Sequence, residues 1–297
     1  MLVKYSPWLR YFGEYLCGYL GGKPLMGTPP IPDADRCFMV GCSLYGPAEV
    51  AHLEELVSKV PRVGVMFTGG DLLQVAELHP NQRAKAQKAF ERCRFCIDGG
   101  RDSVAEAEAL IQHVVRVVNL PPKHMHALRP LPQGDTFHIS FRVSPTYPED
   151  YGYSLVDGAA RLLPNTFRFH LHHVAGFDSK HKLPLPLPTN LELHPKGIED
   201  MDAFLSTVSC SLRFPKHDTI SMVSIEAMLA GRYVLTNSKQ TRHAIVVDEN
   251  PQAIADAILR ARDLCRKRPE GNTYASNYYH SAHSPQQFVD FVDDLLK

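Results

Sequence analysis

Residues 214–237 read FPKHDTISMVSIEAMLAGRYVLTN, a strand end followed by a short helix and a second strand. The first strand ends at Phe214, Ser221 is a helix N-cap, and Gly231 ends the helix in the left-handed conformation. Tyr233–Thr236 then form the second strand. Such a unit belongs to a parallel sheet that is covered by helices on both faces. The free N–H groups at the helix start point to the carboxyl edge of the sheet, an arrangement that binds a diphosphate.

The same alternation of strands and helices extends through the rest of the chain. Strands are expected at 1–5, 37–41, 62–67, 93–97, 114–120, 136–143, 167–174, 191–194, 208–214, 233–236 and 244–247, and helices at 8–20, 47–60, 103–113, 153–163, 199–207, 221–230, from 250 and at 285–297. Gly21–Pro32 has turn chemistry without a period and is expected to be a loop, and 121–134, with four prolines, is the expected linker. We therefore expect an α/β protein with Rossmann-like domains at 1–130 and 131–284.

Length and charge exclude several classes of protein. The 297 residues correspond to roughly two domains. The number of Lys and Arg residues (32) equals that of Asp and Glu (32), so the net charge is near zero. This excludes a protein that binds nucleic acid through a uniformly basic surface. No apolar run is long enough for a membrane span, and no signal-peptide pattern begins the chain. Seven scattered cysteines do not form a disulfide framework, so a cytoplasmic protein is expected.

Glu226 stands out on the helix of the quoted stretch. Met222, Ile225 and Leu229 form its apolar stripe, and Glu226 lies beside that stripe instead of opposite it. A carboxylate in this place needs a partner, and a pair of sugar hydroxyls above a phosphate-binding helix start is a natural one. A glutamate that reaches solvent or a neighbouring arginine fits the spacing equally well.

The acidic pair Asp218-x7-Glu226, followed by AMLAGRYV, resembles the signature of retaining GT-B glycosyltransferases. The pattern is most similar to that of glycosyltransferase family four, Glu-x7-Glu-Ala-Met-Ala-x-Gly-x-Pro-Val, with Asp218 in place of the first Glu and Tyr233 in place of Pro. By element order the resemblance covers about 136–262, and the first half matches as a generic Rossmann unit. It implies the GT-B fold, with two Rossmann-like domains that face each other across a cleft and helix 285–297 crossing back to the first domain.

The resemblance also implies roles for residues of a donor site. Glu226 would bind the ribose hydroxyls of a nucleotide sugar, and Asp218 would face the sugar, although its shorter side chain sets the carboxylate further back. The diphosphate would be held by the Ser221 hydroxyl and by the backbone amides of Ile220, Ser221, Met222 and Val223. The nucleotide base would lie near His194 and Lys196, where no residue selects uracil over guanine.

Two cations of the family neutralise the leaving diphosphate without a metal. Arg142 matches the arginine, for which an ordinary surface arginine is the alternative interpretation. Pro148 stands about where the lysine is expected, so Lys216 is the candidate to replace that charge. Without a replacement, the activity is weak or the acceptor assists.

The first domain offers fewer signals. Trp8 and Arg10 follow the first strand, and either line an acceptor cleft or belong to a surface helix. Gly69, Gly70 and Asp71 follow another strand at the carboxyl edge, where a close approach to an acceptor and a plain tight turn fit equally well.

No metal site or other cofactor is expected. Cys93 and Cys96 have the spacing of a metal knuckle, but on one strand they would face opposite sides, so core cysteines are the favoured interpretation. His170 and His172 share a strand face, yet no carboxylate lies at ligand spacing along the chain.

The sequence thus predicts a glycosyltransferase that moves a sugar from a nucleoside diphosphate, most simply UDP, to an unidentified acceptor with retention. The alternatives are a GT-B epimerase and a catalytically weak nucleotide-sugar-binding protein. Modified DNA bases, a lipid and a small metabolite remain open as acceptors, and the sequence does not indicate an oligomeric state. A DNA acceptor would use the basic residues Arg83, Lys85, Lys88, Arg92 and Arg94, which are otherwise the solvated face of a helix.

Overall fold

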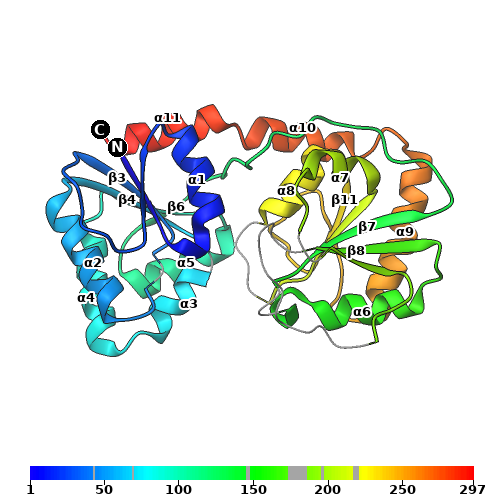
Figure 1. Cartoon of the computed structure of the whole chain (residues 1–297), viewed down its shortest axis with the longest axis horizontal. Coiled ribbons are helices and arrows are strands. Elements are labelled where there is room, and N and C mark those ends of the chain that lie inside the picture. Colours follow the sequence, from blue (N-terminus) through cyan, green and yellow to red (C-terminus); the bar gives the residue numbers. More distant parts are fainter. Residues whose placement is uncertain (43, 69, 145–147, 173–185, 195–196, 217–220) are drawn as a thin grey trace. The chain divides into compact units, whose positions relative to one another are not determined.

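The computed structural model describes residues 1–42, 44–68, 70–144, 148–172, 186–194, 197–216 and 221–297. The chain divides into two compact units, each with a parallel sheet of its own (Figure 1). The first unit comprises Met1–Lys123 and His283–Lys297, and the second comprises His124–His217 and Ser221–Ala282. Residues 124–130, expected in the first domain, are thus grouped with the second unit.

The first unit is built on six parallel strands. Their spatial order is β2 (Lys23–Met26), β1 (Leu2–Tyr5), β3 (Arg36–Val40), β4 (Arg62–Phe67), β5 (Phe95–Asp98) and β6 (Val115–Val117). The order reverses between β1 and β3, and ligands of open α/β sheets bind at the carboxyl ends of the strands at such a point.

Helices flank this sheet and bury its apolar residues. They are η1 (Pro7–Leu9), α1 (Arg10–Tyr19), α2 (Pro47–Lys59), α3 (Gly70–Glu77), α4 (Pro80–Glu91), α5 (Arg101–Ile111) and the C-terminal α11 (Pro285–Leu295). Contacts join α11 (red in Figure 1) to α1 (blue). The rings of Phe288 and Phe38 lie 6.0 Å apart, and Arg36 pairs with Asp293 at 3.1 Å. The last helix therefore packs against the first unit.

The second unit has the strand order of a dinucleotide-binding fold. Its six parallel strands are, in space, β12 (Ile245–Val246), β11 (Tyr233–Thr236), β10 (Cys210–Arg213), β7 (Phe137–Arg142), β8 (Phe167–His172) and β9 (Leu191–His194). The helical segments are η2 (Pro148–Tyr151), α6 (Tyr153–Leu162), α7 (Met201–Thr207), α8 (Met222–Leu229), α9 (Pro251–Lys267) and α10 (Thr273–Ala282). The order reverses between β7 and β10, which places the binding edge of this unit at the ends of those strands.

The two faces of the second sheet differ in polarity. Phe137, Ile139 and Phe141 of β7 belong to the apolar core, which also includes residues of α6 and α9. The alternate residues of the same strand, His138, Ser140 and Arg142, belong to the other face. Parallel sheets are normally apolar on both faces, so the polar face requires a separate explanation.

The structure corrects the expectation of a loop at Gly21–Pro32. Lys23–Met26 is the edge strand β2, parallel to β1, and only Leu25 of its four residues is buried. An edge strand bonds to a neighbour on one side, so Pro24 is tolerated and no apolar period develops. The sequence therefore gave no strand signal there.

Helices α3 and α10 were also not expected. The expected helix at 8–20 begins as the short 3-10 turn η1 before α1. None of the helices within the described ranges is long and apolar enough to cross a membrane.

Candidate functional site

Helix α8 begins at the carboxyl edge of the second sheet, after β10. Ser221 is its N-cap, as the sequence predicted, and its hydroxyl oxygen accepts the N–H of Ser224 at 3.4 Å. Helix geometry leaves the amides of Met222 and Val223 without an acceptor inside the helix. The positive end of the helix dipole and these amides suit a phosphate group.

Glu226 lies on the most open strip of α8. Six of the eight helix residues are buried, and the remaining two, Met222 and Glu226, are half-buried. They stand four residues apart and therefore on the same face. Met222 is thus not the buried stripe residue that the sequence suggested. The strip that leads from the helix start carries one carboxylate, within reach of a ligand bound at that start.

Several predicted site residues fall outside the described part of the chain. Asp218, Ile220, Lys196 and Gly69 do so entirely. Gly70 and Asp71 open α3 and Trp8 lies in η1, but the side chains of Asp71 and Trp8 are not described.

Two arginines end the strands at the reversal point of the second sheet. Leu212 of β10 pairs with Phe141 of β7, so the next residues, Arg213 and Arg142, end neighbouring strands. Both side chains are half-buried, and the Arg213 guanidinium lies 4.4 Å from the centre of the Tyr151 ring. Of these two arginines, the sequence predicted only Arg142. Arg213 was missed because the register between β7 and β10 is not visible along the chain.

Lys216 is engaged with Asp150. Its ammonium lies 3.3 Å from a carboxylate oxygen of Asp150, and its backbone N–H donates to the Asp150 carbonyl at 2.9 Å. The side chain is 67% exposed, so the pair adds little stability. Arg213 is the better placed second cation.

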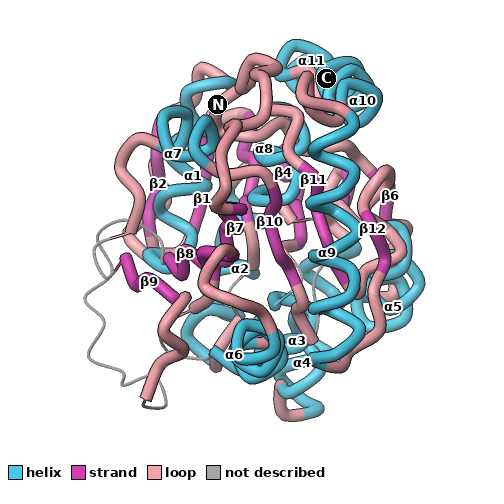
Figure 2. Tube along the Cα trace, turned by 90° about the vertical axis from the view of Figure 1, so that its right-hand side faces the viewer, coloured by secondary structure: helices cyan, strands magenta, loops and turns pink. Residues whose placement is uncertain are grey.

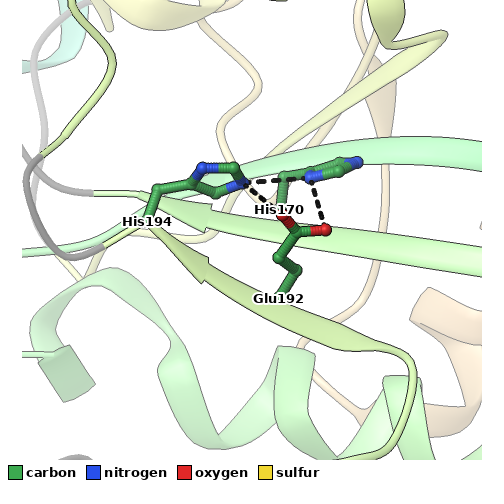
Figure 3. Close-up of side chains that lie close together, drawn as sticks. All are labelled: His170, Glu192 and His194. Atoms are coloured by element: carbon green, nitrogen blue, oxygen red, sulfur yellow. Dashed lines mark hydrogen bonds and ion pairs between the residues drawn. The ribbon is translucent and has the colours of Figure 1, made fainter.

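His194 belongs to a cluster on the polar face of the second sheet (Figure 3). Its Nε2 lies 3.1 Å from Nδ1 of His170 and 3.8 Å from a carboxylate oxygen of Glu192. Figure 2 shows β7, β8 and β9, which carry this part of the face, in succession. Burial lowers the pKa of His170 to about 4, so this ring is neutral at pH 7. No carboxylate lies at ligand spacing from these histidines along the chain, because Glu192 comes from the neighbouring strand.

The first unit has a cavity of about 270 Å³ at its own reversal point. Ser6 follows β1, and Gly41 follows β3, and both line it. Lys4 and Glu49 supply its charged groups. Burial lowers the pKa of Lys4, and its ammonium donates to the carbonyl of Gly27. The cavity therefore combines two charged side chains with an apolar lining that includes Met39 and Leu53.

The basic residues considered for DNA contacts do not act alike. Arg83 of α4 donates to the carbonyls of Ala76 and Leu78 at the end of α3, which holds it against the protein. Lys85 and Lys88 are exposed, as expected for the solvated face of a helix. Arg10 is exposed and pairs with Glu14 at 2.8 Å.

The cysteine pair has a different geometry from the one expected. Cys93 follows α4, and β5 begins only at Phe95, so the two thiols are not on one strand. A hydrogen bond with Cys93 and burial raise the pKa of the Cys96 thiol. Both thiols are buried, which agrees with core cysteines.

Neither a protein-family profile nor a curated protein matches the sequence. Solved structures do match it. TarM has a TM-score of 0.64 at 12% identity over 90% of this chain, which spans 56% of TarM. Sucrose-phosphate synthase from Thermosynechococcus elongatus has a TM-score of 0.69 at 10% identity, over 99% of this chain and 98% of that one. HepE of Anabaena, solved with UDP and glucose, has a TM-score of 0.65 at 11% identity, over 100% and 99% of the two chains.

The chain has the GT-B fold. Because the sequence identity to these structures is only 10–12%, the similarity shows a shared fold and nothing more. The expected α/β class with two Rossmann-like units is confirmed by the two parallel sheets and by these GT-B neighbours.

Proposed function

We propose that the protein is a glycosyltransferase that moves a sugar from a UDP-sugar to an acceptor bound by the first unit. The observation that carries this proposal is the half-buried Glu226 on the open strip of α8, just beyond a helix start whose first amides have no acceptor inside the helix. The GT-B fold supports it, and HepE, a structural neighbour, was also solved with UDP-glucose.

In this proposal the second unit binds the donor through its backbone and one carboxylate. The amides of Met222 and Val223 and the Ser221 hydroxyl hold the diphosphate, and Glu226 accepts hydrogen bonds from the ribose hydroxyls. A helix start binds the diphosphate of any nucleotide sugar, so the carboxylate provides the selection for the ribose.

Charge on the leaving UDP is neutralised by Arg142 and Arg213. These guanidiniums are fixed at the ends of neighbouring strands before the reaction begins, so little reorganisation accompanies the charge that develops on the diphosphate. In the family pattern a lysine is expected at about the position of Pro148. Arg213 supplies the positive charge of that lysine in this proposal. Retention of configuration, and Asp218 as the group that faces the sugar, follow from the resemblance to family four and are part of the proposal.

The acceptor binds in the cavity that Lys4 and Glu49 line. Its volume of about 270 Å³ lies just below the usual range of small-molecule sites, which favours a small metabolite over duplex DNA or a lipid. The inward hydrogen bonds of Arg83 remove one of the cations that a DNA acceptor would need.

The decisive test measures UDP binding and transfer in the full-length protein and in Glu226→Gln. UDP and UDP-glucose should raise the thermal midpoint of the wild type, and Glu226→Gln should weaken binding by roughly tenfold to a hundredfold, since one charge-assisted hydrogen-bond pair is lost. Glu270→Gln, an exposed glutamate of the same unit, should bind as the wild type does. Equal binding by both variants, or no binding of any nucleoside diphosphate, would refute the donor site.

Pro148 at the lysine position and Asp218 at the first acidic position favour a second candidate, a nucleotide-sugar-binding protein or epimerase without transfer. Mass spectrometry of metabolites, lipid extracts and DNA nucleosides, after incubation with mixed nucleotide sugars, separates the two. A new glycosylated product that disappears with Asp218→Ala supports transfer. Donor binding without a glycosylated product supports the second candidate, and an epimerised nucleotide sugar identifies the epimerase.

A further inference from the structure

The polar face of the second sheet carries a group of side chains that donor binding does not use. His138, His170 and Glu192 come from three successive strands, and His170 and His172 are buried there. Strand pairing places His170 beside Glu192 and His172 beside His194. Buried imidazoles on a sheet face are unfavourable unless their nitrogens have partners.

The three side chains in Figure 3 present their ligand atoms to one another. Nδ1 of His170 lies 3.1 Å from Nε2 of His194 and 3.7 Å from Oε2 of Glu192, and His194 Nε2 lies 3.8 Å from Oε1 of Glu192. Ligand atoms about 2.0–2.1 Å from a tetrahedral Zn²⁺ are separated from each other by roughly 3.3–3.4 Å. The cluster therefore has the spacing of a metal site before any ion is bound.

A second layer of contacts holds two of these ligands in orientation. Nε2 of His170 lies 2.9 Å from Nδ1 of His138, so the other ring nitrogen of His170 is directed at the cluster. Arg168 Nε lies 3.3 Å from Oε2 of Glu192, which leaves Oε1 available on the side of His194. Metal-binding histidines and carboxylates usually have such outer partners.

An aromatic ring covers the cluster. Phe204 of α7 lies with its centroid 5.8 Å from that of His170 and 6.0 Å from that of His194. An apolar cover limits access of water and strengthens ion–ligand interactions.

We propose that His170, Glu192 and His194 bind one divalent transition-metal ion, with Zn²⁺ the best-fitting ion. Two imidazoles and a carboxylate match the ligand preference of Zn²⁺, whereas Mg²⁺ and Ca²⁺ prefer oxygen ligands only. The ion joins β8 to the edge strand β9. His194 is then a metal ligand and not a contact of the nucleotide base.

A purely hydrogen-bonded cluster is the competing explanation. Without an ion, Nε2 of His194 and Nδ1 of His170 share a hydrogen bond, and Glu192 pairs with Arg168. This arrangement binds no metal. The two explanations therefore differ in whether the protein takes up Zn²⁺ through these side chains.

The test titrates chelator-treated full-length protein with ZnCl₂ and, separately, with CoCl₂ as a spectroscopic probe. We expect one ion per chain at these side chains, a Co²⁺ absorption spectrum typical of nitrogen and oxygen ligands, and a thermal midpoint raised by several degrees. His194→Ala and Glu192→Gln should each weaken binding at least about tenfold. Both side chains are partly exposed, so these variants should fold, which circular dichroism checks.

His113→Ala in the first unit is the matched control, because this histidine is also half-buried, and it should bind Zn²⁺ as the wild type does. Glu192→Asp, which keeps a carboxylate, should retain part of the affinity. Binding that is unchanged in His194→Ala and Glu192→Gln, or no uptake at micromolar Zn²⁺, would overturn the proposal. Glu226→Gln should keep the ion, so failure here is distinguishable from failure of the donor site.

Discussion

Arg213 is the residue whose role can be tested most directly. It ends β10 beside the end of β7, where Arg142 lies, and Lys216 is paired with Asp150. If Arg213 neutralises the leaving diphosphate, Arg213→Met should lower kcat by roughly 10²–10³, as losing one preorganised charge donor does. Turnover of a UDP-sugar, by transfer or hydrolysis, is the measurement.

Arg260→Met serves as the control because Arg260 is exposed on α9. It should leave kcat unchanged. A loss of activity in Lys216→Met with none in Arg213→Met would reverse the assignment of the second cation.

His283 makes the stability of the first unit depend on pH. Its ring is 1% exposed, and Nδ1–H donates to the Leu120 carbonyl at 2.7 Å. Burial lowers the pKa of His283, so the unfolded chain takes up a proton that the folded chain refuses. The stabilisation is complete above the unfolded pKa of about 6.5 and is lost as the pH falls toward the folded pKa.

Urea unfolding at several pH values between 5 and 7.5 measures this effect. In the wild type the free energy of unfolding should fall with decreasing pH, with His283 contributing at most about 1.4 kcal/mol per pH unit. His283→Gln should be less stable at pH 7.5 but show a shallower slope. Parallel slopes for the two proteins would contradict the prediction.

At the residue scale, the sequence could predict only what lies close along the chain. Ser221 and Glu226 share one helix, so their spacing alone placed the N-cap and the carboxylate near each other. Glu192 and His170 are on different strands, and only the parallel register brings them together. The same limit hid Arg213.

At the scale of the elements, Arg232 stabilises the turn that connects α8 to β11. This side chain is 0% exposed, and its guanidinium donates to the carbonyls of Val208 and Pro130, each at 3.0 Å, and also to Arg129. Burial lowers the pKa of Arg232 to about 10. Arg232→Met should therefore destabilise the protein by about 3 kcal/mol, because buried carbonyls lose their donors.

Thermal and urea unfolding measure this loss. Arg232→Lys should recover only part of it, since an ammonium cannot reach several carbonyls as the planar guanidinium does. Arg266→Met removes an exposed arginine and should change the free energy of unfolding by less than about 0.5 kcal/mol. A stable Arg232→Met would show that the carbonyls find other donors.

Elements with buried faces were predicted well, and elements at edges were not. β4 begins and ends at the residues expected from its apolar run, Arg62–Phe67. β2 and α10 lack such a run. β2 is an edge strand that pairs with one neighbour and buries only one residue, and α10 (Thr273–Ala282) is rich in polar residues. An element that buries one face needs apolar residues at regular spacing, and this spacing is what predicts the element from the sequence. Elements that bury few residues lack the pattern.

At the scale of the whole molecule, two separate cores allow the ligand response of each unit to be observed. One core draws its residues from 2–115 and the other from 131–265. The single tryptophan, Trp8, belongs to the first unit, so its fluorescence reports the unfolding of that unit. Calorimetry reports both.

If UDP binds the second unit alone, it should raise only the transition of that unit. At a UDP concentration 100 times the Kd, the expected stabilisation is about 2.7 kcal/mol, which shifts the calorimetric midpoint of the second unit by several degrees. The Trp8 midpoint should stay where it is, and Glu226→Gln should abolish the shift. An equal rise of the Trp8 midpoint would mean that the two cores unfold together as one cooperative block, because a ligand stabilises only the structure whose unfolding releases it.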